Sequence, residues 1–191
     1  QEVMPPAVVA KISNKIIRQA KNDEDSFIER SETGVTVVQM RNYRIVICRP
    51  PFSNVNEVTA VKPIVALTLD DYDLPDKVLN RLGEAEGILV AGRPGAGKST
   101  FISALAEFYL EKNKLVKTIE SVRDLNVPKE IAQYGMLKNS FEGTADILLL
   151  IRPDYTIFDE VRTKDDFKIF GDMRLAGIGL VGVVHASKAV D

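Results

Sequence analysis

The sequence has one cysteine, one histidine and no long apolar run, and these shortages exclude several classes of protein. The single cysteine, Cys48, rules out a disulfide within the chain and a cysteine-rich zinc site. The longest apolar stretches, 147–151 and 176–184, are far shorter than the roughly 18 residues that a membrane-spanning helix needs. Because the first residues also lack a basic start followed by an apolar segment, the sequence predicts a cytoplasmic protein without membrane insertion.

An excess of charge of either sign is also missing. The 191 residues carry 25 Lys and Arg against 27 Asp and Glu, a net charge of −2. This balance predicts no general attraction to nucleic acid or to an anionic membrane, so any such contact has to be local or lie outside this chain. A hydrophobic content of 45% is that of an ordinary globular chain with a core of its own.

The first third of the chain contains a helical pattern followed by a β-rich pattern. Apolar residues at positions 8, 9, 12, 16 and 17 predict an amphipathic helix that begins behind Pro5-Pro6 and ends near Asn22. An acidic, polar stretch follows over 22–31. Beyond it, runs rich in β-branched residues predict a small antiparallel sheet with strands at 35–40, 43–48 and 57–65.

From residue 87 onward, short apolar runs alternate with longer helical or loop stretches. The runs predict buried strands at 88–91, 115–119, 155–158 and 179–184, which is the pattern of a parallel α/β sheet. A polar segment at 70–76 precedes this part and indicates a domain boundary. The predicted organisation is an N-terminal helix and linker at 1–24, a small β-rich (α+β) domain at 25–76 and an α/β core at 77–191.

The most specific motif is the segment 92–100, GRPGAGKST, which matches G-x-x-x-x-G-K-[ST] between a predicted strand and a predicted helix. Its glycines let backbone N–H groups converge on phosphate oxygens, Lys98 places a charge against the β and γ phosphates, and Ser99 offers a hydroxyl to Mg²⁺. The expected ligands are ATP and Mg²⁺. The expected nucleotide-binding residues are Gly92, Pro94, Gly95, Ala96, Gly97, Lys98, Ser99 and Thr100.

Titratable residues follow the other predicted strands. Asp159 and Glu160 come after the strand at 155–158, and a P-loop enzyme needs such acidic groups: Asp159 for the metal shell and Glu160 as general base. Glu120 ends the strand at 115–119, and His185 follows the last strand, both at the sheet edge where α/β proteins bind ligands. A solvated acidic turn and a structural histidine are the alternative interpretations.

Four segments resemble, in order, the Walker A, acidic box, Walker B and histidine box of the secretion and pilus-retraction ATPase superfamily. They are 92–100, 118–120, 153–162 and 182–185. Within that superfamily, the residues at 123–128, 151–155 and 172–177 most resemble those of the archaeal ATPases that carry a PIN domain before the motor and a KH-type domain after it. The resemblance runs from about residue 35 to residue 191.

This resemblance implies a RecA-like P-loop core behind a small β-rich domain, in a ring that is normally a hexamer. It implies that the N-terminal domain of one subunit presses on its neighbour's core and moves with the nucleotide state. It also implies DNA processing, including branch migration of Holliday junctions, with branched DNA held mainly by domains outside this chain and other recombination proteins as further partners. Because the chain ends shortly after His185, the resemblance identifies it as a truncated core without its PIN and KH domains.

Three positions depart from the family pattern. Asp159 stands where the family has glycine, Ser121 where the acidic box continues with aspartate, and Ile178 where pilus motors often have histidine. These departures weaken the pilus assignment more than the ATPase assignment.

Ring ATPases complete each site with arginines that reach across the subunit boundary to the γ-phosphate. Arg44 and Arg49, on or beside the predicted small sheet, are the preferred candidates for this role. Solvated strand or turn arginines are the alternative interpretation.

The leading functional prediction is an ATP-hydrolysing hexameric motor core that acts on branched DNA. The first alternative uses the same core to drive pilus or secretion assembly, and the second is a monomeric P-loop phosphotransferase, for which the sequence supplies no compact arginine-rich lid. A guanine-nucleotide switch is excluded because no Asn-Lys-x-Asp motif is present. A non-enzymatic binding module stays open for this segment alone, because a lone subunit would lack its partner's arginines.

Overall fold

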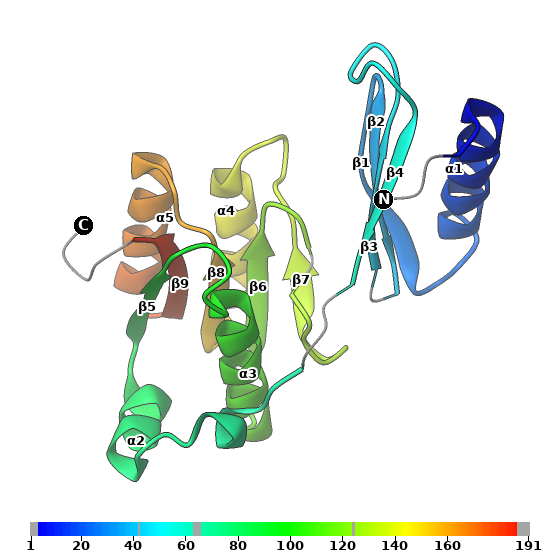
Figure 1. The fold of residues 1–191 in the computed structure, drawn as a ribbon. Helices are drawn as coiled ribbons and strands as arrows, with labels where there is room; N and C mark the ends of the chain where they lie inside the picture. Colours follow the sequence, from blue (N-terminus) through cyan, green and yellow to red (C-terminus); the bar gives the residue numbers. More distant parts are fainter. Residues whose placement is uncertain (1–3, 42, 63–65, 124, 187–191) are drawn as a thin grey trace. The chain divides into compact units, whose positions relative to one another are not determined.

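The computed structural model describes residues 4–41, 43–62, 66–123 and 125–186. The chain divides into two compact units, residues 1–64 and 65–191, each built around one sheet (Figure 1). The first sheet is antiparallel with strand order β1-β2-β3-β4, and the second is parallel with order β5-β9-β8-β6-β7. The predicted fold class, an α/β core preceded by a small β-rich domain, is confirmed.

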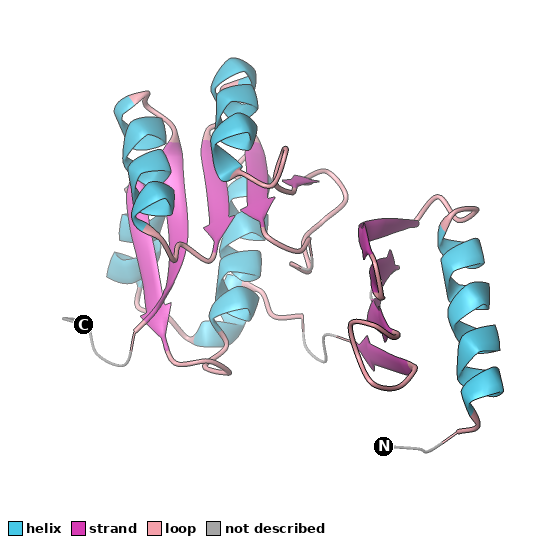
Figure 2. Ribbon diagram, turned by 90° about the horizontal axis from the view of Figure 1, so that it is seen from above, coloured by secondary structure: helices cyan, strands magenta, loops and turns pink. Residues whose placement is uncertain are grey.

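Helix α1 (Pro6–Ala20) covers one face of the first sheet (Figure 2). Pro6 occupies the first helical turn, where its missing N–H costs nothing, and the helix ends two residues before the predicted end. An apolar stripe of the helix packs on alternate residues of the sheet. The buried residues of this core are Ala20, Val38, Ile45 and Ile47.

The four strands of the first sheet are β1 (Ser26–Glu32), β2 (Val35–Met40), β3 (Tyr43–Cys48) and β4 (Glu57–Val61). Met40 pairs with Tyr43 across a tight turn in which Arg41 has a left-handed φ of 54°. The strand predicted at 57–65 ends at Val61, and residues 63–65 lie outside the described part of the chain.

Strand β1 is a correction, because the sequence predicts no strand in the polar stretch 22–31. Only Ser26 of its residues is buried, and the strand lies at the sheet edge, so backbone pairing with β2 holds it in place without an apolar run. A register shift between Ile28 and Arg30 also breaks the alternation by which a strand is recognised in a sequence.

The second unit contains every strand predicted for the core, each with its ends shifted by at most one residue. No described helix is both long enough and apolar enough to cross a membrane. The short edge strand β7 is not among the predicted strands. The elements are η1 (Leu69–Tyr72), α2 (Asp76–Glu84), β5 (Gly87–Gly92), α3 (Lys98–Glu111), β6 (Val116–Glu120), β7 (Ala132–Tyr134), α4 (Phe141–Ile151), β8 (Tyr155–Asp159), α5 (Lys164–Leu175) and β9 (Gly179–His185).

Helices cover both faces of the parallel sheet, with α3 on one face and α4 and α5 on the other (Figures 1 and 2). Ile157 of β8 belongs to the apolar cluster on the α3 side, and the next residue, Phe158, belongs to the cluster on the α4 and α5 side. Burial on both faces explains why the central strands read as continuous apolar runs in the sequence.

The boundary between the units differs from the predicted one at residue 76. The polar segment 70–76 is part of the second unit, because Leu69 is buried and the Tyr72 ring lies edge-on to Phe101 of α3, with 5.2 Å between ring centroids. Because most residues of this segment are acidic, its composition does not indicate that Leu69 and Tyr72 pack against the second unit. The predicted separate segment 1–24 likewise belongs to the first unit, since α1 packs on that sheet.

Two fully buried threonines on adjacent strands allow a test of this packing. The Oγ1 atom of Thr156 has no hydrogen-bond partner among the described residues, whereas Thr118 Oγ1 donates to Glu120 at 2.5 Å. We expect Thr156→Val to raise the free energy of unfolding by about 1 kcal/mol, because a buried unpaired hydroxyl is removed, and Thr118→Val to lower it. Chemical denaturation measures both, and a destabilised Thr156→Val protein would contradict the assignment.

Candidate nucleotide-binding and catalytic site

The carboxyl ends of three adjacent strands bring the motif residues together. Strand β9 lies between β5 and β8, with His185 paired to Gly92 on one side. The phosphate loop follows β5, Glu160 follows β8 and His185 ends β9, so the histidine lies between the loop and the carboxylate. Since parallel α/β sheets bind ligands beyond the carboxyl ends of their strands, this edge is the candidate site.

The loop before α3 has the conformation that phosphate binding requires. Gly95 and Gly97 have φ values of 77° and 81°, a left-handed region that glycine adopts without strain. A Cβ atom added at either glycine would meet nothing within 4 Å, so both positions border open space. Gly97 is the N-cap of α3, and the free N–H groups and positive dipole end of that helix favour an anion there.

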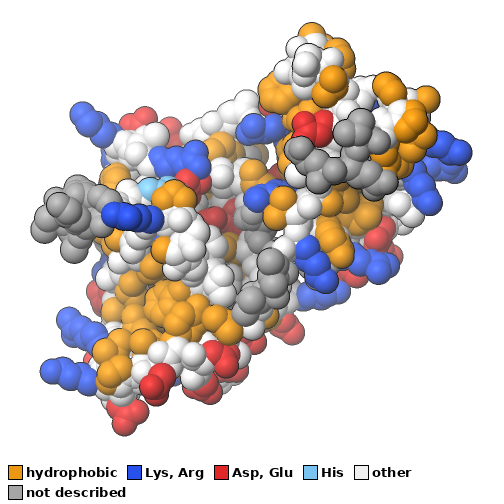
Figure 3. Space-filling view, viewed as in Figure 1, with side chains coloured by type: hydrophobic (Ala, Val, Ile, Leu, Met, Phe, Trp, Pro, Cys, Tyr) orange, Lys and Arg blue, Asp and Glu red, His pale blue; other side chains and the backbone are white. Residues whose placement is uncertain are grey.

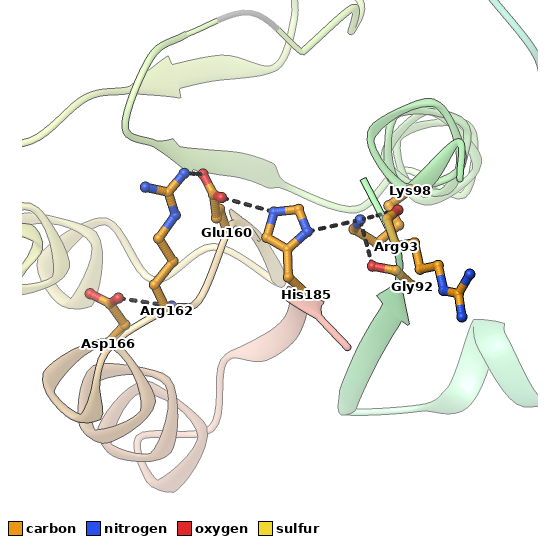
Figure 4. A network of polar contacts seen from close by, with 7 residues as sticks. All are labelled: Gly92, Arg93, Lys98, Glu160, Arg162, Asp166 and His185. Carbon is orange, nitrogen blue, oxygen red and sulfur yellow. Dashed lines mark hydrogen bonds and ion pairs between the residues drawn. The ribbon is translucent and has the colours of Figure 1, made fainter. Parts of the chain in front are cut away.

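Lys98 is buried, with 8% of its surface exposed, and its ammonium group has three acceptors within reach. Nζ donates to the carbonyl oxygens of Gly92 at 2.8 Å and Arg93 at 3.0 Å, and lies 3.2 Å from His185 Nδ1 (Figure 4). Each N–H of the ammonium therefore has one partner, and none of the three partners is a carboxylate.

The protonation of His185 follows from these contacts. An ammonium group can only donate, so Nδ1 accepts and the imidazole proton is on Nε2. Nε2 in turn lies 2.9 Å from Glu160 Oε1, to which it donates. The second oxygen of Glu160 forms an ion pair with Arg162. Lys98, His185, Glu160 and Arg162 thus form one continuous polar chain (Figure 4).

Glu160 adopts a backbone conformation that is unusual for its residue type. Its φ of 77° lies in the left-handed region, which costs a non-glycine residue about 1–3 kcal/mol. Its side chain is 18% exposed and is held by both His185 and Arg162. The conformation is therefore maintained by the surrounding contacts and gives the carboxylate a fixed place beside the imidazole.

These residues surround a pocket of about 450 Å³, a volume typical of small-molecule sites. Six of the eight expected nucleotide-binding residues line it. Of the other two, Gly92 contributes the carbonyl that holds Lys98, and the N–H of Ala96 closes the loop turn onto Arg93 O. The lining residues are Pro94, Gly95, Gly97, Lys98, Ser99, Thr100, Asp159, Glu160, Val183 and His185.

Ser99 and Asp159, the two expected metal ligands, line this same pocket. A hydroxyl and a carboxylate are hard oxygen donors, and Mg²⁺ is usually held through one or two carboxylates together with substrate phosphates. The residues present therefore fit a magnesium–nucleotide complex. Burial raises the pKa of Asp159 to about 6, and the neighbouring carboxylates of Glu120 and Glu160 add to this shift, which Lys98 and Arg162 oppose.

Glu120 lies at the same sheet edge, opposite Asp159 in the register of β6 and β8, but it is fully buried. Its carboxylate accepts hydrogen bonds from Thr118 Oγ1, from the backbone N–H of Leu125 at 2.9 Å and from Gln133 Nε2 at 2.9 Å. It is not among the described residues that line the pocket. The carboxylate of Glu120 is thus held by groups of its own unit, behind the residues that line the pocket.

Arg44 and Arg49 belong to the first unit, whereas every lining residue belongs to the second. Arg44 lies on β3, paired with Gln39 and Val61. Arg49 follows β3, and its Nη2 atom is buried without a hydrogen-bond partner among the described residues. This donor distinguishes Arg49 from Arg44, although Nη2 would have to become exposed before an anion from outside the unit could reach it.

Arg162 and Asp166 are site residues that the sequence analysis does not identify. Asp166 accepts hydrogen bonds from the backbone N–H groups of Arg162 at 3.0 Å and Thr163 at 2.8 Å. These bonds fix the segment that carries Arg162 beside Glu160. The signal is present in the sequence, because Thr163-x-x-Asp166 is a capping-box pattern at the start of α5.

Comparison with curated proteins gives two archaeal relatives with high sequence identity. The chain is 59% identical over 181 residues to an uncharacterised KH and PIN-domain containing protein of Methanocaldococcus jannaschii, covering 94% of this chain and 28% of that protein. It is 50% identical over 184 residues to the Holliday junction branch migration ATPase PINA of Sulfolobus acidocaldarius, covering 96% of this chain and 36% of that protein. The chain thus spans about a third of the length of these relatives.

Solved structures with the same fold include an ATPase and a pilus retraction motor. The chain matches the ATPase DotB of Legionella pneumophila with a TM-score of 0.65 and 17% identity, covering 99% of this chain and 56% of that one. It matches the pilus retraction motor PilT with bound ADP with a TM-score of 0.66 and 21% identity, covering 95% and 55%. No protein-family model matches the chain. The resemblance drawn from the motifs is confirmed, in sequence by the archaeal relatives and in fold by these two structures.

The raised pKa of Asp159 predicts how the stability of the ligand-free protein depends on pH. The folded state binds this proton more tightly than the unfolded state. The free energy of unfolding therefore falls by about 3 kcal/mol as the pH rises from about 4 through 6. We expect Asp159→Asn to match the parent protein at pH 4 and to exceed its stability at pH 7, measured by denaturant unfolding across this range.

The exposed Asp146 of α4 gives a matched control, since Asp146→Asn should change stability little at any pH. Equal pH profiles for the parent protein and Asp159→Asn would contradict a raised pKa at this carboxyl.

Proposed function

We propose that this chain, homologous to a segment of the archaeal KH- and PIN-domain proteins, is the ATP-hydrolysing core of a ring-forming motor that acts on branched DNA. The observation that carries the proposal is the polar chain from Lys98 through His185 to Glu160 along the phosphate-loop pocket. The name of the Sulfolobus relative, a Holliday junction branch migration ATPase, supports the DNA substrate.

Nucleotide binding in this proposal changes the partners of Lys98. The ammonium group exchanges the carbonyls of Gly92 and Arg93 for phosphate oxygens, which carry full charges and attract it more strongly. Backbone N–H groups at the start of α3 bind the same phosphates. Ser99 and Asp159 would hold Mg²⁺, which supplies charge neutralisation at the β and γ phosphates.

Glu160 is the base of the proposed reaction. Its carboxylate lines the pocket, accepts a hydrogen bond from His185 and is oriented by Arg162. From this place it can orient a water molecule and accept its proton as the water attacks the γ-phosphate. When Lys98 turns to the phosphates, His185 Nδ1 loses its donor, so occupation of the loop is communicated directly to the group that holds the base.

The full-length protein that contains this segment provides the test of this function. We expect its ATPase rate to rise with four-way DNA junctions above the rates without DNA and with duplex DNA. Glu160→Gln should keep ATP binding and lower kcat by about 100-fold or more, because the amide preserves the shape and loses the basicity. Lys98→Ala should abolish both ATP binding and hydrolysis.

The alternative cargo, a pilus or secretion apparatus, is supported by the fold alone. The two candidates differ in one outcome. If the protein hydrolyses ATP at the same rate with and without junctions or duplexes, the action on DNA is rejected and the ATPase motor is retained. Absence of hydrolysis by an assembled, full-length protein would reject the ATPase itself.

We further infer that the site is completed by a neighbouring subunit. Arg49 is half-buried, and its Nη2 atom has no hydrogen-bond partner among the described residues. A rotation of the side chain that brings Nη2 to the surface would let this guanidinium meet an anion from outside its own unit. A γ-phosphate bound to the adjacent subunit of a ring is such an anion, and arginines supplied in this way stabilise the charge that develops in phosphoryl transfer.

Mixing two inactive variants tests this inference. Subunits with Lys98→Ala bind no productive ATP but keep Arg49, whereas subunits with Arg49→Ala bind ATP but provide no arginine. We expect a mixture to recover part of the ATPase activity at interfaces that combine an intact loop with an intact Arg49. Arg44→Ala in place of Arg49→Ala is the matched control. Absence of recovery in particles confirmed as hexamers by light scattering would mean that Arg49 acts within its own subunit or is structural.

A further inference from the structure

A second pocket lies entirely within the first unit, between the C-terminal half of α1 and the turn that joins β2 to β3. Its volume is about 710 Å³, enough for one nucleotide unit. Lys15 and Arg18 of the helix line one side, and Arg41 and Tyr43 line the other. None of these residues takes part in the phosphate-loop site.

The cations of this pocket are available to a ligand. Lys15 and Arg18 are exposed, and neither has an ion-pair partner within the part of the chain that the structure describes. Arg41 contacts Asp23 only at 3.9 Å, and 75% of its side chain is exposed, so solvent screens this pair. Asp23 itself already accepts hydrogen bonds from the N–H of Asp25 and the hydroxyl of Ser26.

The cations are also arranged along a line. Positions 11, 15 and 18 of a helix lie on the same face, so Lys11 extends the basic side of the pocket by a turn. On the face drawn in Figure 3, many of the Lys and Arg side chains lie near Asp or Glu. Lys11, Lys15 and Arg18 thus form a basic track on α1. Such a local concentration of positive charge is compatible with the net charge of −2 of the whole chain.

Tyr43 adds an aromatic surface to the basic track. Tyr43 is 41% exposed, and the ammonium of Lys62 lies 5.5 Å from the centroid of its ring. An exposed ring among cations is the combination that binds single-stranded nucleic acid, because bases stack on the ring while phosphates meet the charges. Duplex DNA keeps its bases stacked inside and offers the ring nothing to stack on.

We propose that this pocket binds an unpaired nucleic-acid strand, with one base on Tyr43 and successive phosphates on Arg41, Arg18 and Lys15. The inference rests on the proposed action on branched DNA, since branched substrates expose unpaired bases where strands exchange. It assigns a DNA contact to this segment, in addition to any contact made elsewhere in the full-length protein.

Ultraviolet crosslinking of the full-length protein to a 12-nucleotide thymidine oligomer carrying one 5-iododeoxyuridine gives a direct test. We expect mass spectrometry to locate the crosslink at Tyr43. We also expect Tyr43→Ala to weaken binding of the plain oligomer by about tenfold in fluorescence anisotropy, and Tyr43→Phe to retain it, because a phenyl ring still stacks. Binding of a blunt duplex should change little in both variants.

Charge variants test the phosphate contacts separately. Lys15→Gln with Arg18→Gln should make the dependence of log affinity on log salt shallower by about 1.4 units, as expected for two lost phosphate contacts on a single strand. Lys77→Gln with Lys168→Gln, exposed lysines of the second unit, changes the net charge equally and should leave the slope unchanged. Circular dichroism checks that each variant is folded.

Two results would overturn the inference: crosslinks confined to other segments, or oligomer affinity that Tyr43→Ala and the charge variants leave unchanged. Failure of the proposed motor function gives a different result. If junctions do not change the ATPase rate but the oligomer still crosslinks to Tyr43, the strand site is retained and the branched-DNA motor is rejected.

Discussion

The buried ammonium group of Lys98 is the constraint on which the site depends. A cation with 8% exposure needs partners for all of its N–H donors, and here two are loop carbonyls and the third is an imidazole nitrogen. The carbonyl of Gly92 is available because the loop curves through left-handed glycines. The imidazole is available because β9, which ends in His185, is inserted beside β5.

In the proposed function, that arrangement would make His185 an intermediary between substrate binding and catalysis. A neutral imidazole can accept on one nitrogen only while it donates from the other, so the hydrogen bond to Glu160 and the contact with Lys98 depend on the same tautomer. Glu160 is held on its other oxygen by Arg162, and its left-handed backbone depends on these contacts. A change at Lys98 therefore alters the surroundings of the carboxylate without moving any strand.

Local patterns predict the components of the site from the sequence, and non-local topology decides how they meet. The phosphate loop, Asp159, Glu160 and His185 each stand at a strand end that apolar runs reveal. The strand order β5-β9-β8-β6-β7 depends on packing between distant segments, so the contact of Lys98 with His185, 87 positions apart, has no sequence signal. The burial of Glu120 and the edge strand β1 also cannot be predicted from local patterns. Hydrogen bonds from Thr118, Leu125 and Gln133 hold Glu120, and backbone pairing with β2 holds β1.

The charge of the site also limits what it can bind. Glu120, Asp159 and Glu160 stand at one sheet edge, and their mutual repulsion contributes to the raised pKa of Asp159 despite the opposing effect of Lys98 and Arg162. A triphosphate would bring several further negative charges to this edge, and one lysine with the dipole of α3 offsets only part of them. A divalent cation shared between the phosphates, Ser99 and Asp159 would restore the balance and hold Asp159 in its ionised form. In the proposed function, the same carboxylates would thus favour nucleotide bound together with its metal over free nucleotide.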